Sequence, residues 1–166
     1  MKFEEIPRLI QDSGSLIKEH MPKSNDLELI ILKGHILLEY ILNQIINIKS
    51  DNNLEIENTN FSFNQKIEIL VILNIIENNS DIFQILKNWN TLRNQIAHRL
   101  NFDRKLVDKL IKLGVKWTKG ENHLPSIDSE RAKALKFLIP MTSGQLTGQL
   151  AGSEYKKSAS KVNNAK

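Results

Sequence analysis

The stretch "LELIILKGHILLEYILNQIINI", residues Leu27–Ile48, predicts a long buried helix. One face of this helix carries apolar residues three and four positions apart, which are Leu27, Ile30, Ile31, Leu37, Leu38, Ile41, Leu42 and Ile45. Gly34 lies at the centre of that face, where the missing side chain lets another helix come close. The remaining side carries further apolar residues, namely Leu29, Leu32, Ile36 and Tyr40. A helix that is apolar nearly all round is expected to be deeply buried or to bury a second face in an oligomer.

The rest of the sequence predicts an all-α helical bundle of about five to six helices, because the 3.6-residue period recurs and no sustained period-2 stretch is present. The other expected helices cover residues 3–19, 63–77, 81–100, 103–114 and 128–150. Ser24 or Asp26 is expected to cap the long helix, and Asp81 and Asp103 to cap the fourth and fifth. Pro140 is expected to kink the last helix. We therefore expect one helical domain over residues 1–150.

The C-terminal residues 151–166 form a basic segment with almost no apolar side chains. They hold four lysines against one glutamate, a net charge of +3 out of the +4 of the whole chain. Such a segment cannot bury enough surface to order, so we expect a flexible, disordered basic tail. Its charge would add non-specific attraction to phosphates.

Composition excludes several classes of protein. The chain has no cysteine, so disulfides, zinc fingers and thiol catalysis are excluded. No uninterrupted apolar run reaches the roughly 18 residues that span a bilayer. The first residues, "MKFEEIPRLI", place carboxylates where a signal peptide would be apolar. We expect a cytoplasmic protein without a membrane partner.

A second stretch, "WNTLRNQIAHRL", residues Trp89–Leu100, places an arginine among apolar residues. On a helix Arg93 lies within about 60° of Trp89 and the rest of the apolar face. A buried charge without a partner is costly, so Arg93 needs an ion pair or a cleft. Asn94 and His98 are four residues apart on a neighbouring face, and the three side chains could border one site. Spacing alone favours a simpler alternative, in which Arg93 makes a structural ion pair or extends its stem to the surface.

The long helix offers polar partners for this candidate site. His35 and Glu39 are four residues apart beside the apolar face, and we expect Glu39 to pair with Arg93 or to orient it. The same two residues could supply two metal ligands, but no third ligand is evident, so we expect no metal and no cofactor. His20 and His123 are expected at the surface.

The hexapeptide "RNQIAH", Arg93–His98, resembles the R-polar-x-x-x-H motif of the HEPN superfamily, a group of small α-helical domains found in prokaryotic toxins, anti-phage systems and RNA-processing proteins. The segment "KGHILLEYIL" is also similar to one seen in HEPN-like bacterial proteins. The resemblance covers roughly residues 24–100. It implies an HEPN-like fold and a metal-independent endoribonuclease that acts as a homodimer on an RNA substrate.

The resemblance also implies a role for each motif residue. Arg93 would bind the scissile phosphate, Asn94 would help to orient it, and His98 would act as acid and base; a dimer would bring two copies of His98 into one cleft. A toxin or defence effector of this kind would have an antitoxin or a defence-system partner protein. In one toxin branch the second residue after the motif histidine is a tyrosine that a partner antitoxin adenylylates, but this chain has Leu100 there. The alternatives are a non-catalytic helical dimerisation or interaction module that binds protein or nucleotide, and a basic-tailed nucleic-acid binder without chemistry.

Overall fold

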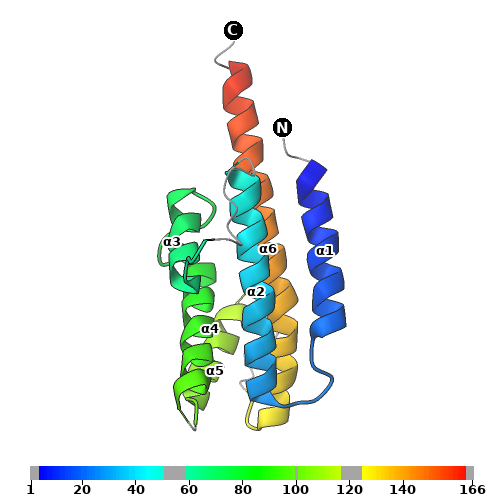
Figure 1. The fold of residues 1–166 in the computed structure, drawn as a ribbon, viewed down its shortest axis with the longest axis vertical. Coiled ribbons are helices and arrows are strands. Elements are labelled where there is room, and N and C mark those ends of the chain that lie inside the picture. The colour runs from blue at the N-terminus through cyan, green and yellow to red at the C-terminus, as the bar shows by residue number, and fades with distance from the viewer. Residues whose placement is uncertain (1–3, 51–58, 100, 117–124, 164–166) are drawn as a thin grey trace.

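The computed structural model describes residues 4–50, 59–99, 101–116 and 125–163. These residues form six helices and no strand, which confirms the all-α prediction (Figure 1). The helices are α1 (Glu5–His20), α2 (Leu27–Lys49), α3 (Phe63–Ile72), α4 (Asp81–His98), α5 (Arg104–Val115) and α6 (Asp128–Asn163). The expected end of the fourth helix at Leu100 and the expected surface position of His123 lie outside the described residues.

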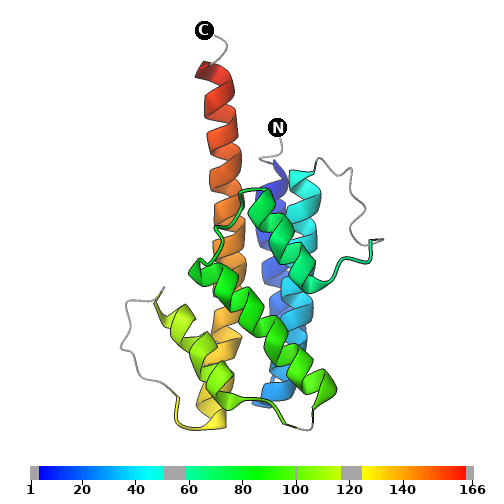
Figure 2. The same ribbon diagram turned by 90° about the vertical axis from the view of Figure 1, so that its left-hand side faces the viewer.

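Helices α1, α2 and α6 run side by side, and α3, α4 and α5 cover the side of α2 and α6 away from α1 (Figures 1 and 2). α2 contacts α1, α3, α4 and α6, so it is the central element of one continuous hydrophobic core. By length and composition α2 is apolar enough to cross a membrane, a property shared with core helices of soluble proteins. Of the 18-residue stretch of α2 that meets this criterion, 56% is buried inside the bundle. The outward side of α2 leaves Leu29 and Ile36 exposed.

Gly34 marks the place where α2 and α4 meet, as the sequence predicts. The fully buried indole of Trp89 lies against it, and a β-carbon at Gly34 would lie 2.4 Å from Trp89 Cζ2 and 2.7 Å from Ile139 Cδ1. Trp89 Nε1 donates a hydrogen bond to the Ile31 carbonyl oxygen at 3.0 Å, which satisfies the buried indole N–H. The absence of a side chain at Gly34 therefore sets how closely α4 approaches α2.

The helix starts agree with the sequence, with one exception. Asp26 accepts a hydrogen bond from the Leu29 N–H, and Asp103 accepts one from the Lys105 N–H, so both cap their helices as expected. For α4 the expected cap Asp81 is wrong: the Ser80 hydroxyl caps the Phe83 N–H instead. Asp81 is then free to accept a hydrogen bond from Lys116 Nζ at 2.9 Å.

α3 ends five residues before the position expected from its pattern. Asn74 has a positive φ of 54°, a conformation that asparagine adopts more readily than most residues. The N–H of Ile75 bonds back to the Leu70 carbonyl and that of Asn74 to the Val71 carbonyl, which closes the helix end. Ile75 and Ile76 are buried in the connection that follows, so their apolar character reflects packing of a turn and not a continuing helix.

The last helix differs from its expected end at Leu150. α6 runs continuously through Pro140, whose ring is exposed, and on to Asn163 (Figure 2). The expectation that nothing packs from Ala151 onward is corrected by Lys49 of α2, whose Nζ lies 3.0 Å from Ser153 Oγ and 2.7 Å from Glu154 Oε1. Both charged side chains of this pair are only 12% exposed. The ion pair thus holds the first turn beyond Leu150 against α2.

Candidate functional site

Arg93 lies where the core-facing side of α4 reaches the edge of the bundle. Trp89 and Leu92 just before it are fully buried, whereas Ala97 one turn later is exposed. Arg93 itself is half-buried. The stem of the arginine therefore packs at the rim while its guanidinium can meet solvent. This position explains how a charge is tolerated on the apolar face of the helix.

The three motif residues occupy the last two turns of α4. Arg93 Nη1 donates a hydrogen bond to Asn94 Oδ1 at 3.2 Å, so the structure brings these two side chains together. Asn94 is exposed, and so is His98, the last residue of α4. Within the described part of the chain, His98 has no side-chain hydrogen bond or ion pair. Its imidazole is thus open to solvent one turn beyond Asn94.

Gln95 fixes the end of the motif helix, a role that sequence reasoning missed. Its Oε1 accepts a hydrogen bond from the Asp103 N–H at 2.9 Å, and its carbonyl accepts one from the Arg99 N–H at 2.8 Å. The first bond joins the C-terminal turn of α4 to the cap of α5. The polar residue inside the motif was the available signal, but its partner lies eight residues away across a connection.

His35 of α2, in contrast to Asn94 and His98, is buried. Its Nε2 lies 3.2 Å from Asn90 Oδ1, and its ring packs on Phe63 with centroids 4.3 Å apart. Burial lowers the pKa of His35, against the opposing effects of the Asn90 hydrogen bond and the Glu39 charge, while Arg93 and Lys66 lower it further. A neutral imidazole donates to Asn90 from Nε2, so His35 ties α2 to α4 and does not face solvent.

The sequence predicts that Glu39 pairs with Arg93, but in the structure Glu39 has other partners. It accepts a hydrogen bond from Lys66 Nζ of α3 at 2.6 Å and lies 3.8 Å from His35 Nδ1. Lys66 is buried, so its ammonium needs this carboxylate. No ion pair joins Arg93 to a carboxylate among residues 4–50, 59–99, 101–116 and 125–163. The Arg93 guanidinium therefore keeps most of its hydrogen-bonding capacity for a ligand.

The side chains of Arg93, Asn94 and His98 form a small cationic surface with hydrogen-bonding groups. Arg93 offers fork-shaped donors that match a phosphate, and Asn94 offers an amide held against it. His98 offers an imidazole at the same end of the helix. His20, the other described histidine outside the α2 network, is exposed at the end of α1, as expected. In the described segments no three His, Asp or Glu side chains lie close enough together to hold a metal ion.

Comparison with protein-family models, with curated proteins and with solved structures finds no match to this chain.

Proposed function

We propose that this protein is an endoribonuclease of HEPN type that cuts RNA without a metal ion and acts as a toxin or an anti-phage effector. The observation that carries the proposal is the Arg93–Asn94 hydrogen bond with His98 exposed one turn further on. These are a phosphate-binding guanidinium, an orienting amide and an acid–base group, presented by one helix. The packing of Trp89 on Gly34 and the Gln95–Asp103 hydrogen bond hold both parts of this helix in place.

The proposed reaction is an attack within the RNA. One His98 takes the proton from a ribose 2′-OH, and the freed oxygen forms a bond to the adjacent phosphorus. The bond from phosphorus to the 5′-oxygen breaks, and that oxygen takes a proton from a second imidazolium. Arg93 stabilises the extra negative charge on the phosphoryl oxygens. The products are a 2′,3′-cyclic phosphate and a 5′-hydroxyl.

The need for two histidines leads to the second part of the proposal, a homodimer. Each chain has one motif histidine, and a two-fold dimer supplies the second copy to a shared cleft. The outer side of α2 supports this arrangement, because Ile36 is 61% exposed and Leu29 is 40% exposed on one side of that helix. On the helix, Ile36 follows His35, whose ring bonds to α4, so the exposed apolar side of α2 lies about 100° around the helix from that contact with α4.

The test compares His98→Ala with a matched control. His20→Ala removes another exposed histidine from the last residue of a helix, so it controls for the loss of a surface imidazole. We expect His98→Ala to lower RNA cleavage by at least ~10²-fold and His20→Ala to leave it unchanged. Wild-type activity should persist in excess EDTA, and product ends should be 2′,3′-cyclic phosphates. Cleavage that requires added Mg²⁺, or that leaves 5′-phosphates, would contradict the mechanism.

A non-catalytic interaction module is the second candidate function. The observation that favours it is the exposed apolar residue Ile36 on α2, together with a His98 that no described side chain orients. The same experiment separates the two functions. If purified wild type and His98→Ala behave alike in every RNA assay, while the protein still self-associates, the interaction module replaces the nuclease.

A further inference from the structure

A buried polar network joins α2, α3 and α4 next to Arg93. His35 of α2 is 6% exposed, and Lys66 of α3 is 5% exposed. His35 Nε2 lies 3.2 Å from Asn90 Oδ1, and Lys66 Nζ lies 2.6 Å from Glu39 Oε1. Asn90 precedes Arg93 by three residues, so the two side chains are neighbours on one side of α4. The network therefore adjoins the guanidinium that is proposed to bind phosphate.

One ring nitrogen of His35 is available for a second proton. Because Asn90 presents its Oδ1, which only accepts, Nε2 carries the hydrogen of the neutral ring and Nδ1 keeps a lone pair. Nδ1 lies 3.8 Å from Glu39 Oε2, so these two acceptors share no hydrogen bond. A proton on Nδ1 would turn this contact into an ion pair. Glu39 is 33% exposed, so a proton from solvent can reach the ring past its carboxylate.

The charges around His35 oppose this proton in the absence of a ligand. They are Glu39 on the same helix, Lys66 on α3 and Arg93 on α4. With a neutral imidazole the three groups leave one net positive charge, and a proton on His35 adds another in a poorly hydrated interior. Burial and the two cations accordingly hold the pKa of His35 below its ordinary value. A phosphate on Arg93 would bring a negative charge that offsets the added proton.

We propose that His35 takes up a proton at Nδ1 when a phosphate binds to Arg93, and that it is a positioning residue for this phosphate site. The inference rests on the proposed function only in taking Arg93 as the phosphate-binding group. The proton comes from solvent, and the imidazolium keeps its bond to Asn90 while it gains one to Glu39. Because coupling between two binding events is reciprocal, a phosphate then binds more tightly as the pH falls.

Sulfate is the first probe, because it resembles a phosphate and stays fully ionised over the pH range used. Nuclear magnetic resonance follows the ring of His35, identified by its packing on Phe63 with centroids 4.3 Å apart. Compared with chloride at equal ionic strength, sulfate should raise the pKa of His35 by about 0.7, which equals a coupling of about 5-fold. An unchanged titration of His35 in sulfate would overturn the inference.

Arg93→Gln removes the proposed link between the anion and His35. It should raise the pKa of His35 without any anion, because one of the two cations is lost, and it should abolish the effect of sulfate. A sulfate effect that survives this substitution contradicts the inference.

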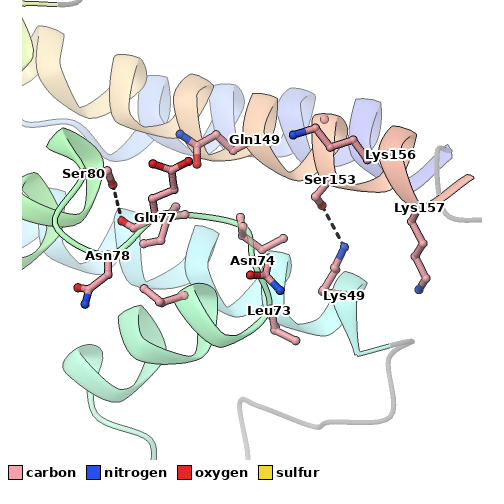
Figure 3. Close-up of a pocket in the computed structure, with 14 residues that line it drawn as sticks. Lys49, Leu73, Asn74, Glu77, Asn78, Ser80, Gln149, Ser153, Lys156 and Lys157 are labelled. Carbon is pink, nitrogen blue, oxygen red and sulfur yellow. Dashed lines mark hydrogen bonds between the residues drawn. The ribbon is translucent and has the colours of Figure 1, made fainter. Parts of the chain in front are cut away.

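Two variants serve as controls for the loss of a positive charge. Arg99→Gln is the matched one, because it removes an exposed guanidinium at the end of the same helix that is not among the charges acting on His35. Lys156→Gln removes a charge from the groove between residues 73–80 and α6, at the opposite end of α4 (Figure 3). Both controls should keep the effect of sulfate on His35.

The second probe is a fluorescent 2′-O-methyl RNA, which lacks the attacking hydroxyl and stays intact. Its affinity is measured by fluorescence anisotropy in His98→Ala, so that the exposed motif histidine does not contribute. We expect the affinity to rise by about 5-fold between about pH 7.5 and about pH 5.5, and by clearly less in His98→Ala/His35→Gln. The resonance experiment needs no change at His35, so it decides the question even if His35→Gln folds poorly.

The outcomes separate this inference from the proposed function. A rise in the pKa of His35 with sulfate supports the inference even if the wild type cuts no RNA, in which case the nuclease proposal alone fails. Equal pH dependence of RNA binding with and without His35 overturns the inference even if the wild type cuts RNA. Failure of both probes to bind also overturns it.

Discussion

Gly34 of α2 lies directly against the indole of Trp89 of α4, leaving no room for a β-carbon between them. Trp89 is fully buried and its N–H is bonded to Ile31, so the ring cannot move aside without breaking that bond. We expect Gly34→Ala to destabilise the fold by about 1–3 kcal/mol through overpacking. Urea unfolding monitored by circular dichroism measures the difference.

The control for this substitution is Gly144→Ala. Gly144 is also inside a helix, but apart from its chain neighbours and the backbone of its own helix no described atom lies within 4 Å of the position of its β-carbon. The same change should there stabilise the protein by up to about 1 kcal/mol, because alanine favours a helix. Equal effects of the two substitutions would show that the α2–α4 contact is looser than described.

His35 should make the stability of the fold depend on pH. Burial lowers its pKa in the folded protein below the ordinary value near 6.5, so the unfolded chain binds a proton first as the pH falls. Above about pH 7 the histidine is neutral in the folded and the unfolded chain and does not change the free energy of unfolding. This free energy falls as the pH falls below about 6.5 towards the pKa of the folded protein. We expect the free energy of unfolding to fall less between about pH 7.5 and about pH 5 in His35→Gln than in the wild type.

The groups around His35 define how this pH experiment is read. Glu39 on α2, Lys66 on α3 and Arg93 on α4 all act on the imidazole, so each charge is kept in the His35→Gln comparison. If wild type and His35→Gln lose the same free energy over this pH range, His35 does not titrate with folding.

The Glu39–Lys66 ion pair should show strong coupling. Glu39→Gln leaves the buried Lys66 ammonium without its carboxylate, and Lys66→Met leaves Glu39 without its cation. We expect each single change to cost about 1–3 kcal/mol, the lower end for Lys66→Met because Glu39 is 33% exposed. The double variant should cost less than the sum of the two, which a double-mutant cycle from urea unfolding detects. Additive costs would contradict the pairing.

The C-terminal end of α6 offers a pair of matched truncations. A chain that ends at Lys157 keeps Ser153 and Glu154 as partners of Lys49, and a chain that ends at Leu150 loses both. We expect the first truncation to leave the melting temperature nearly unchanged and the second to lower it, at about 2–4 °C for each kcal/mol lost. Differential scanning calorimetry gives both values. Equal melting temperatures would support the dispensable tail expected from the sequence.

The proposed homodimer is tested at Ile36. A charge on this exposed residue of α2 should oppose burial of that face against a second copy, so Ile36→Glu is expected to be monomeric where the wild type is dimeric. Ile72→Glu on α3, where the isoleucine is 75% exposed, is the matched control and should remain dimeric. Light scattering coupled to size exclusion measures the mass. A wild-type monomer that still cuts RNA would contradict a shared cleft.

The sequence predicts the parts of this fold that depend on local spacing. The buried stripe of α2 and the close contact at Gly34 follow from periodicity and residue type, and the cap Asp26 is one of the two residues, Ser24 and Asp26, that the sequence offers. The early end of α3 does not, because Asn74 in a left-handed conformation interrupts an apolar pattern that continues through Ile76. The full length of α6 does not follow from the sequence either. Nothing in the basic segment indicates that Glu154 pairs with Lys49 of α2.

The candidate site was predictable in its location but not in its partners. The position of Arg93 on α4 follows from helix geometry. The partner of Glu39 does not, because Lys66 comes from a helix beyond the connection at residues 50–62 and only tertiary packing brings the two together. The Gln95–Asp103 hydrogen bond has the same origin. The sequence pattern of a single chain therefore does not predict contacts between residues that lie on different helices.

The burial of Trp89 gives the protein an internal optical reporter. The chain has two tryptophans, and Trp117→Phe would leave Trp89 as the only one. Its indole is fully shielded from water and lies on the contact between α2 and the motif helix. The emission of the single-tryptophan variant should therefore be blue-shifted while the two helices are together and shift to the red when they separate. Stopped-flow fluorescence would then follow the motion of the motif helix itself, without any attached dye.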